Sequence, residues 1–219
     1  GYRIEYDILG LCYWMLSRAE EVGRTDLDSH DRFPAVNSHA HKNSYLDRPI
    51  VDEWLLVLGQ VIQKTWPKIV LKHNEFKIEV SHDVDSPSQY QFLSNLRFVR
   101  RLVGDVVRGR GVGKIIKAMR IHFSSTAVIS ERDPHNTFDW IMDVSDKYGL
   151  TSSFYFICGR TDRKKDAVYN VGDPAIRQLM RRIHQRGHTV GLHPSYGSYQ
   201  TPKIILNEAL ELKKIANEE

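Results

Sequence analysis

Two aspartates and a distant histidine are the residues whose types and spacing point most directly to chemistry. Asp83 and Asp85 stand two positions apart, and His193 precedes a proline much later in the chain. Two carboxylates at this spacing at the end of a strand project to the same side. Their repulsion is costly unless a cation lies between them or one carboxyl stays protonated. A divalent metal such as zinc, bound by carboxylate and imidazole, would supply that cation.

A predicted strand positions the two aspartates. Phe76, Ile78 and Val80 alternate with polar residues, and this period of two is typical of a strand with one buried face. The strand is expected to begin at Phe76, to run into residues 82–85 and to end at Ser86-Pro87, because proline interrupts strand pairing.

The second half of the chain alternates between predicted strands and helices. Strands are expected over residues 150–158 and 188–193, and helices over 136–149, 175–186 and 198–216. This alternation predicts parallel βαβ units and therefore an α/β fold. Ligands of such folds gather at the carboxyl ends of the strands, where Asp83, Asp85 and His193 would meet. A single histidine at a strand end is more often structural, but the combination favours a metal site. One carboxylate could then serve as a general base.

The N-terminal part of the chain is expected to be mainly helical. Apolar residues at helical spacing predict helices over residues 8–22 and 50–62, separated by a polar stretch over 24–47. Histidines and aspartates in that stretch could suggest a metal site, but their irregular spacing favours a solvated loop. The distant cysteines Cys12 and Cys158 lie in apolar segments, so we expect two buried thiols rather than a disulfide or a metal pair.

A basic region follows the first predicted strand. It contains a single Asp105 and eight Lys or Arg residues, which are Arg97, Arg100, Arg101, Arg108, Arg110, Lys114, Lys117 and Arg120. The helical period breaks at the glycines of residues 109–113, so we expect two helices within an insertion at about 88–130. The charges suggest either an anion-binding surface or a solvated helical face. The second interpretation is preferred, and nucleic acid is an unlikely partner, because no aromatic stacking residues are interleaved.

Composition excludes some classes of protein. The 219 residues are 41% hydrophobic and 26% charged with a net charge of +4, which is ordinary for a globular chain. No apolar run approaches the roughly 20 residues of a membrane helix. The first residues do not form a signal peptide, so a cytoplasmic location is expected. The absence of an initiator methionine suggests a piece of a longer protein.

Two segments together resemble the first two motifs of the polysaccharide deacetylases, the NodB-homology fold of carbohydrate esterase family four. They are residues 80–87, Val-Ser-His-Asp-Val-Asp-Ser-Pro, and residues 187–196, Gly-His-Thr-Val-Gly-Leu-His-Pro-Ser-Tyr. The linking segments 133–140 and 152–156 are also similar to that family. Residues 16–21, 32–33 and 48–54 resemble a helical flank found before a subset of these domains.

This resemblance implies a fold and an activity. Residues 71–219 would form the N-terminal half of a distorted (β/α)7 barrel, preceded by a helical flank over 1–70. The protein would be a metal-dependent hydrolase that removes N-acetyl groups from a carbohydrate, either a cell-surface polysaccharide or its precursor. By position, Asp83 would be the general base, Asp85 and His193 would be metal ligands, and Tyr196 would contact substrate. The metal would be zinc, with cobalt or nickel as alternatives.

The sequence departs from the family pattern in two ways. The family usually has a second histidine four residues after the first, where this chain has Gly197. Water, His82, Ser198 or Tyr199 could complete the site, or metal binding could be weak or absent. The later motifs of the family would lie beyond the last residue. The alternative is therefore a non-catalytic relative that binds a glycan or another polyanion. The sequence identifies neither the sugar nor the oligomeric state.

Overall fold

The computed structural model describes residues 3–72, 75–124 and 127–217. The chain divides into two compact units, Gly1–Phe76 and Lys77–Glu219. The boundary expected from the sequence, between residues 70 and 71, lies a few residues before this division.

The first unit is mainly helical. Its α-helices are α1 (Ile8–Leu16), α2 (His39–Lys42) and α3 (Ile50–Thr65). The side chain of Asp7 caps α1 by accepting a hydrogen bond from the Gly10 amide at 2.9 Å, and α1 packs against α3. The helix predicted over 8–22 ends early, because Arg18 adopts a left-handed conformation before a short 3₁₀ turn. The predicted loop over 24–47 contains another 3₁₀ turn and α2.

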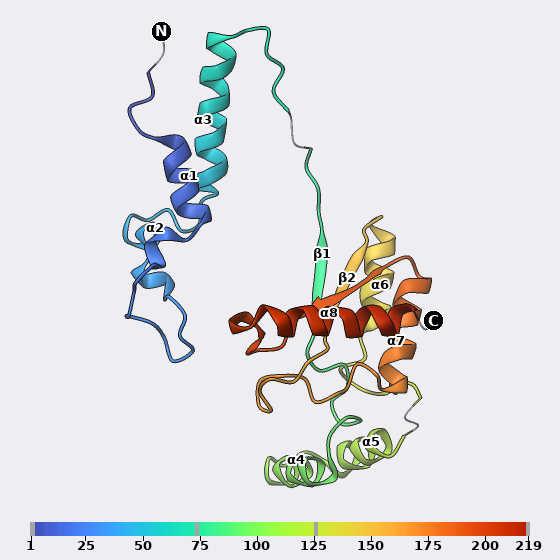
Figure 1. Cartoon of the computed structure of the whole chain (residues 1–219). Helices are drawn as coiled ribbons and strands as arrows, with labels where there is room; N and C mark the ends of the chain where they lie inside the picture. The colour runs from blue at the N-terminus through green and yellow to red at the C-terminus, as the bar shows by residue number, and fades with distance from the viewer. Residues whose placement is uncertain (1–2, 73–74, 125–126, 218–219) are drawn as a thin grey trace. The chain divides into compact units, whose positions relative to one another are not determined.

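The second unit has a parallel sheet with helices packed against it (Figure 1). Its elements are β1 (Val80–Val84), α4 (Asn95–Val107), α5 (Val112–His122), α6 (Phe138–Lys147), β2 (Ser152–Ile157), α7 (Pro174–Gln185), β3 (Thr189–His193) and α8 (Pro202–Asn217). The sheet order is β1-β2-β3, and both pairings are parallel. The predicted α/β class with parallel strands is thus confirmed.

The first strand begins later than the sequence pattern predicts. Strand β1 starts at Val80, which pairs with Ser152 at the start of β2. Phe76 is 90% exposed and Ile78 is 53% exposed, so the predicted buried face over Phe76–Ile78 is wrong. The physical reason is that β2 extends no further toward this end, so these residues have no neighbouring strand to pair with.

The main core lies between the sheet and its helices. Phe154 and Phe156 of β2 are fully buried, and α6 packs against this strand through Met142. Helix α7 packs against β3 and buries one face at helical spacing, including Leu179 and Ile183. Gly187 ends this segment with a φ of 79°, which an L-residue rarely adopts. The core therefore fixes β2 and β3 between helices.

A smaller core joins α4 and α5, the two helices predicted from the basic region. Phe98 and Ile121 are buried in it, and the ring of His122 stacks on Phe98 with centroids 3.9 Å apart. The break between the helices includes Gly109, whose φ is 67°. The prediction of two helices separated by glycines is therefore confirmed.

Both cysteines are free thiols. Cys12 is buried and Cys158 is half-buried. Burial, with added repulsion from Glu211 and Glu208, raises the pKa of Cys158 to about 12. None of the helices in the described ranges is both long and apolar enough to cross a membrane.

Candidate functional site

The structure brings Asp83, Asp85 and His193 together at one end of the sheet. His193 Nε2 lies 3.8 Å from Asp83 Oδ2 and 3.9 Å from Asp85 Oδ1. The two carboxylates stand at the end of β1 and the imidazole at the end of β3, on either side of the end of β2. Their side chains are 63%, 70% and 33% exposed, respectively. The three groups thus face solvent and are accessible to a ligand.

The orientation of the His193 ring leaves one nitrogen available to a ligand. Nδ1 lies 2.9 Å from the carbonyl oxygen of Pro194. A carbonyl only accepts hydrogen bonds, so Nδ1 carries the proton in the neutral imidazole. Nε2 then presents its lone pair toward Asp83 and Asp85. This is the tautomer that a metal-binding histidine needs when its other nitrogen donates to a carbonyl.

The donor set fits a divalent cation in type, with spacing slightly too wide. Zinc bonds of about 2.0–2.2 Å place neighbouring ligand atoms of a tetrahedral site about 3.4 Å apart. The distances from His193 exceed that value by a few tenths of an ångström. Over residues 3–72, 75–124 and 127–217, no group of three or more His, Cys, Asp or Glu side chains already has the spacing of a metal centre. Small movements of exposed side chains would bring these ligands within range.

A buried tyrosine that the sequence analysis did not single out joins the strand ends beneath the site. The Tyr169 hydroxyl donates to the Val84 carbonyl at 2.7 Å and accepts from the Ile157 amide at 2.8 Å. It thereby connects the last residues of β1 and β2. Burial raises the pKa of Tyr169, so its hydroxyl remains protonated and can donate. Ala167, Tyr169 and Val171 alternate within an otherwise charged loop, and this pattern was the available sequence signal.

Tyr169→Phe is expected to lower the free energy of unfolding by about 1–3 kcal/mol, because the Val84 carbonyl and the Ile157 amide would both lose a buried partner. Urea denaturation followed by circular dichroism would measure the change. Tyr148→Phe is the matched control, since Tyr148 is exposed. Equal unfolding midpoints for the two variants would show that the Tyr169 hydroxyl does not stabilise these strand ends.

Two buried carboxylates fix the loop that follows His193. Glu208 of α8 accepts hydrogen bonds from the amide and the hydroxyl of Ser195. Asp166 accepts one from the Tyr196 amide at 2.6 Å. Tyr196, the predicted substrate contact, is exposed, and the Lys165 ammonium lies 3.5 Å from the centre of its ring. The backbone beside the site is therefore anchored, while the aromatic ring remains at the surface.

Gly197 occupies a tightly packed position. Its amide donates to Thr161 Oγ1 at 2.7 Å. A Cβ added there would lie 3.2 Å from both Cβ and Oγ1 of Thr161. The first atom of a side chain at this position would therefore be in close contact with Thr161. Thr161 would have to move by a few tenths of an ångström to accommodate it.

The other candidates for a third ligand use their polar atoms elsewhere. His82 Nε2 lies 3.1 Å from Ser152 Oγ, and the His82 ring stacks on Phe154. The buried Ser198 hydroxyl donates to the Ser195 carbonyl at 2.7 Å. The Tyr199 hydroxyl accepts from Nε2 of the Gln200 side chain at 2.8 Å. None of these contacts draws the side chain toward His193.

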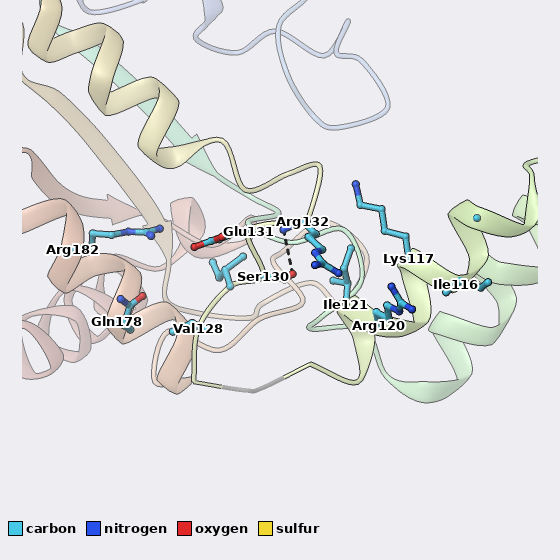
Figure 2. A pocket seen from close by; sticks show the side chains of 12 residues that line it. Ile116, Lys117, Arg120, Ile121, Val128, Ser130, Glu131, Arg132, Gln178 and Arg182 are labelled. Carbon is cyan, nitrogen blue, oxygen red and sulfur yellow. Dashed lines mark hydrogen bonds between the residues drawn. The ribbon is translucent and has the colours of Figure 1, made fainter.

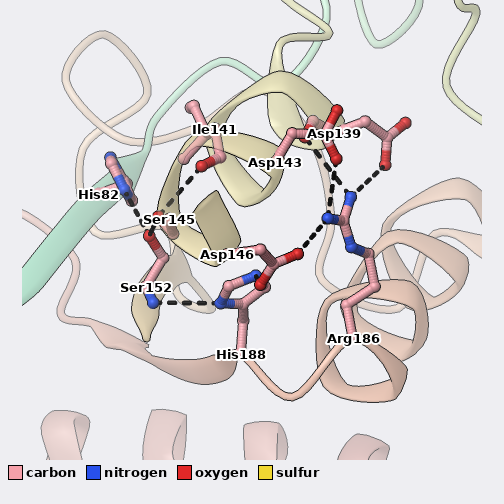
Figure 3. Close-up of polar contacts among 9 residues, drawn as sticks. All are labelled: His82, Asp139, Ile141, Asp143, Ser145, Asp146, Ser152, Arg186 and His188. Atoms are coloured by element: carbon pink, nitrogen blue, oxygen red, sulfur yellow. Dashed lines mark hydrogen bonds and ion pairs between the residues drawn. The ribbon is translucent and has the colours of Figure 1, made fainter. Parts of the chain in front are cut away.

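His82 belongs to a polar cluster at the amino end of the sheet (Figure 3). Ser152 Oγ contacts Ser145 Oγ at 2.7 Å, and the Ser152 amide donates to His188 Nδ1 at 3.1 Å. His188 Nε2 therefore carries a proton, and it lies 3.3 Å from Asp146 Oδ1 without hydrogen-bond alignment. Burial and the nearby His188 lower the pKa of His82. This cluster joins β1, α6, β2 and the residue before β3, and none of these contacts involves Asp83 or Asp85.

Comparison with protein families finds one match. Residues 1–67 match the family of unknown function DUF7033. The match covers most of the helical first unit and assigns no activity. Comparison with curated proteins and with solved structures finds no match to the chain.

Proposed function

We propose that the second unit is part of a metal-dependent carbohydrate N-deacetylase that acts on a cell-surface polysaccharide or its precursor. The observation that carries this proposal is the convergence of Asp83, Asp85 and His193, with Nε2 of the imidazole facing both carboxylates. The three parallel strands would belong to a distorted (β/α)7 barrel. The resemblance of residues 80–87 and 187–196 to deacetylase motifs gives the same assignment.

Asp85 and His193 would hold the metal, which is zinc in the first instance and cobalt or nickel as alternatives. When bound, such an ion polarises a carbonyl and lowers the pKa of water. Asp83 would accept the proton of the attacking water, because its carboxylate is exposed and adjacent to the same imidazole. In the net reaction, water adds to the acetyl carbon and the carbon–nitrogen bond breaks. The products are a free amine on the sugar and acetate.

The exposed aromatic ring of Tyr196 would contact the sugar. One face of the ring lies beside the Lys165 ammonium, and its backbone is fixed by Asp166. A side chain whose backbone is already anchored loses less conformational freedom when a sugar packs against it than one on a mobile loop would.

A second candidate function is suggested by Gly197. The chain has glycine where the deacetylase pattern has its second histidine, and a side chain there would start in close contact with Thr161. A protein with an incomplete ligand set could bind a glycan or another polyanion without hydrolysing it.

Metal binding separates the two functions. The purified chain is expected to bind one equivalent of Co²⁺, giving visible absorption bands, and Zn²⁺ is expected to displace it. Asp85→Asn and His193→Ala should each weaken binding by about 10-fold or more, since each removes a ligand. Asp139→Asn and His184→Ala are matched controls, because both residues are exposed and lie on helices away from the site. Failure of the unmodified chain to bind Co²⁺ or Zn²⁺ would favour the binding protein.

A further inference from the structure

A basic pocket lies between α5, residues 128–132 and α7 of the second unit (Figure 2). Its volume of about 740 Å³ falls within the range of small-molecule sites, roughly 300–1,000 Å³. The charged and amide side chains that line it are Lys117, Arg120, Glu131, Arg132, Gln178 and Arg182. Four cationic groups therefore share this pocket with one carboxylate.

Packed elements hold the first three of these cations. Lys117 and Arg120 are three residues apart on α5 and so share one helix face, and the helix is anchored by the buried Ile121. Arg132 directly precedes Asp133, whose buried carboxylate accepts hydrogen bonds from the backbone and from a serine. The backbone that carries these side chains is therefore well supported.

Helix α7 contributes the fourth cation, Arg182, one turn after Gln178. Arg182 is half-buried, and its Nη1 lies 3.1 Å from Asp139 Oδ2. Its Nε is buried and has no hydrogen-bond acceptor among the residues that the structure describes. An unpaired buried donor is unfavourable. Arg182 also lines the pocket, so its guanidinium adds positive charge there besides pairing with Asp139.

The other charges of the pocket are not neutralised by neighbours. Within the described part of the chain, Lys117, Arg120 and Arg132 form no ion pair, and Glu131 pairs with none of the four cations. Concentrated positive charge in a concave site attracts anions. The described lining includes no aromatic side chain, so neither a nucleic-acid base nor a sugar ring has a stacking surface. The planar forks of three arginines match the geometry of phosphate oxygens.

We propose that this pocket binds a dianionic phosphate group, either as inorganic phosphate or on a phosphorylated small molecule. A phosphate dianion can engage several cations at once, whereas a single carboxylate carries one charge. The inference is independent of the deacetylase proposal, because the pocket and the Asp83, Asp85 and His193 site share no residues.

Phosphate binding can be measured by calorimetry at constant ionic strength. Inorganic phosphate and glucose 6-phosphate are the phosphate probes, and acetate is the monoanion control. The double variant Lys117→Gln/Arg120→Gln is expected to weaken phosphate binding by about 10-fold or more, since it removes two of the charged groups that face the pocket. Arg100→Gln/Arg108→Gln removes two exposed charges outside the pocket, one on α4 and one directly after it, and should leave binding within about 2-fold.

The outcomes separate a specific pocket from general attraction. Tighter binding of glucose 6-phosphate than of inorganic phosphate identifies a phosphorylated small molecule as the ligand, and equal binding identifies free phosphate. Equal loss of binding in both double variants, or binding of acetate as tight as that of phosphate, would overturn the proposal. So would the absence of phosphate binding by the unmodified chain. Circular dichroism of both variants verifies that they fold.

Discussion

Asp83→Asn is expected to reduce the proposed N-deacetylase turnover by about 10²–10⁴-fold, the usual contribution of a general base. Asparagine keeps the shape of the side chain but cannot accept the proton of water. Folding should be unaffected, because the side chain is largely exposed and its neighbour in space is His193 at 3.8 Å. Acetate release from oligomers of N-acetylated amino sugars measures turnover, and thermal denaturation measures folding.

Asp143→Asn is the matched control for this substitution. Asp143 is also an exposed aspartate, and its ion pair with Arg186 joins α6 to the end of α7 (Figure 3). The control should retain full turnover. Equal turnover in Asp83→Asn and in the unmodified protein would remove Asp83 from the proposed chemistry. Loss of turnover together with loss of folding would instead indicate a structural role for this carboxylate.

Asp133→Ala is expected to produce the largest loss of stability, about 3 kcal/mol or more, because it leaves several buried or partly buried donors unpaired at once. The carboxylate of Asp133 is 3% exposed and accepts from the Ser88 hydroxyl and from the amides of Gln89 and His135. It holds the segment after Asp85 against the loop before α6. Metal affinity should therefore fall together with stability. Chemical denaturation and cobalt titration would measure the two effects.

Two further variants separate the lost hydrogen bonds from the lost charge. Asp133→Asn keeps one acceptor oxygen, so it should be less destabilising than Asp133→Ala. Asp139→Ala removes an exposed aspartate whose ion pairs with Arg182 and Arg186 lie at the surface, and it should cost about 1 kcal/mol or less. If Asp133→Ala were no more destabilising than Asp139→Ala, the role given to Asp133 would be incorrect.

Local patterns predicted the regular elements of the second unit well. Strands β2 and β3 and helix α7 follow from apolar runs, helical spacing, Pro174 at the start of the helix and Gly187 after it. These signals are local, since they depend on the conformations and burial of adjacent residues. The start of β1 was mispredicted because its length depends on the partner strand, and the alternation of Phe76 and Ile78 contains no information about that partner.

The candidate site was likewise predictable from the sequence only in part. The rule that ligands gather at the ends of parallel strands was enough to place Asp83, Asp85 and His193 together. It could not identify the supporting contacts, which join distant parts of the sequence. Tyr169 reaches back 85 positions to Val84, and Asp133 reaches back 45 to Ser88. The contact of Gly197 with Thr161 depends on two loops whose conformations no local pattern specifies.

The strand pairing also has a consequence for the order of folding. Val80 pairs with Ser152, a separation of 152 − 80 = 72 residues, whereas Ser153 pairs with Thr189, a separation of 189 − 153 = 36 residues. Doubling a flexible loop raises the entropic cost of closing it by about 0.6 kcal/mol. Closure of β2, α7 and β3 is therefore favoured before β1 docks, and hydrogen exchange during refolding would follow that order. In that order, Asp83 and Asp85 would meet His193 only when β1 pairs with β2, in the last step of sheet assembly.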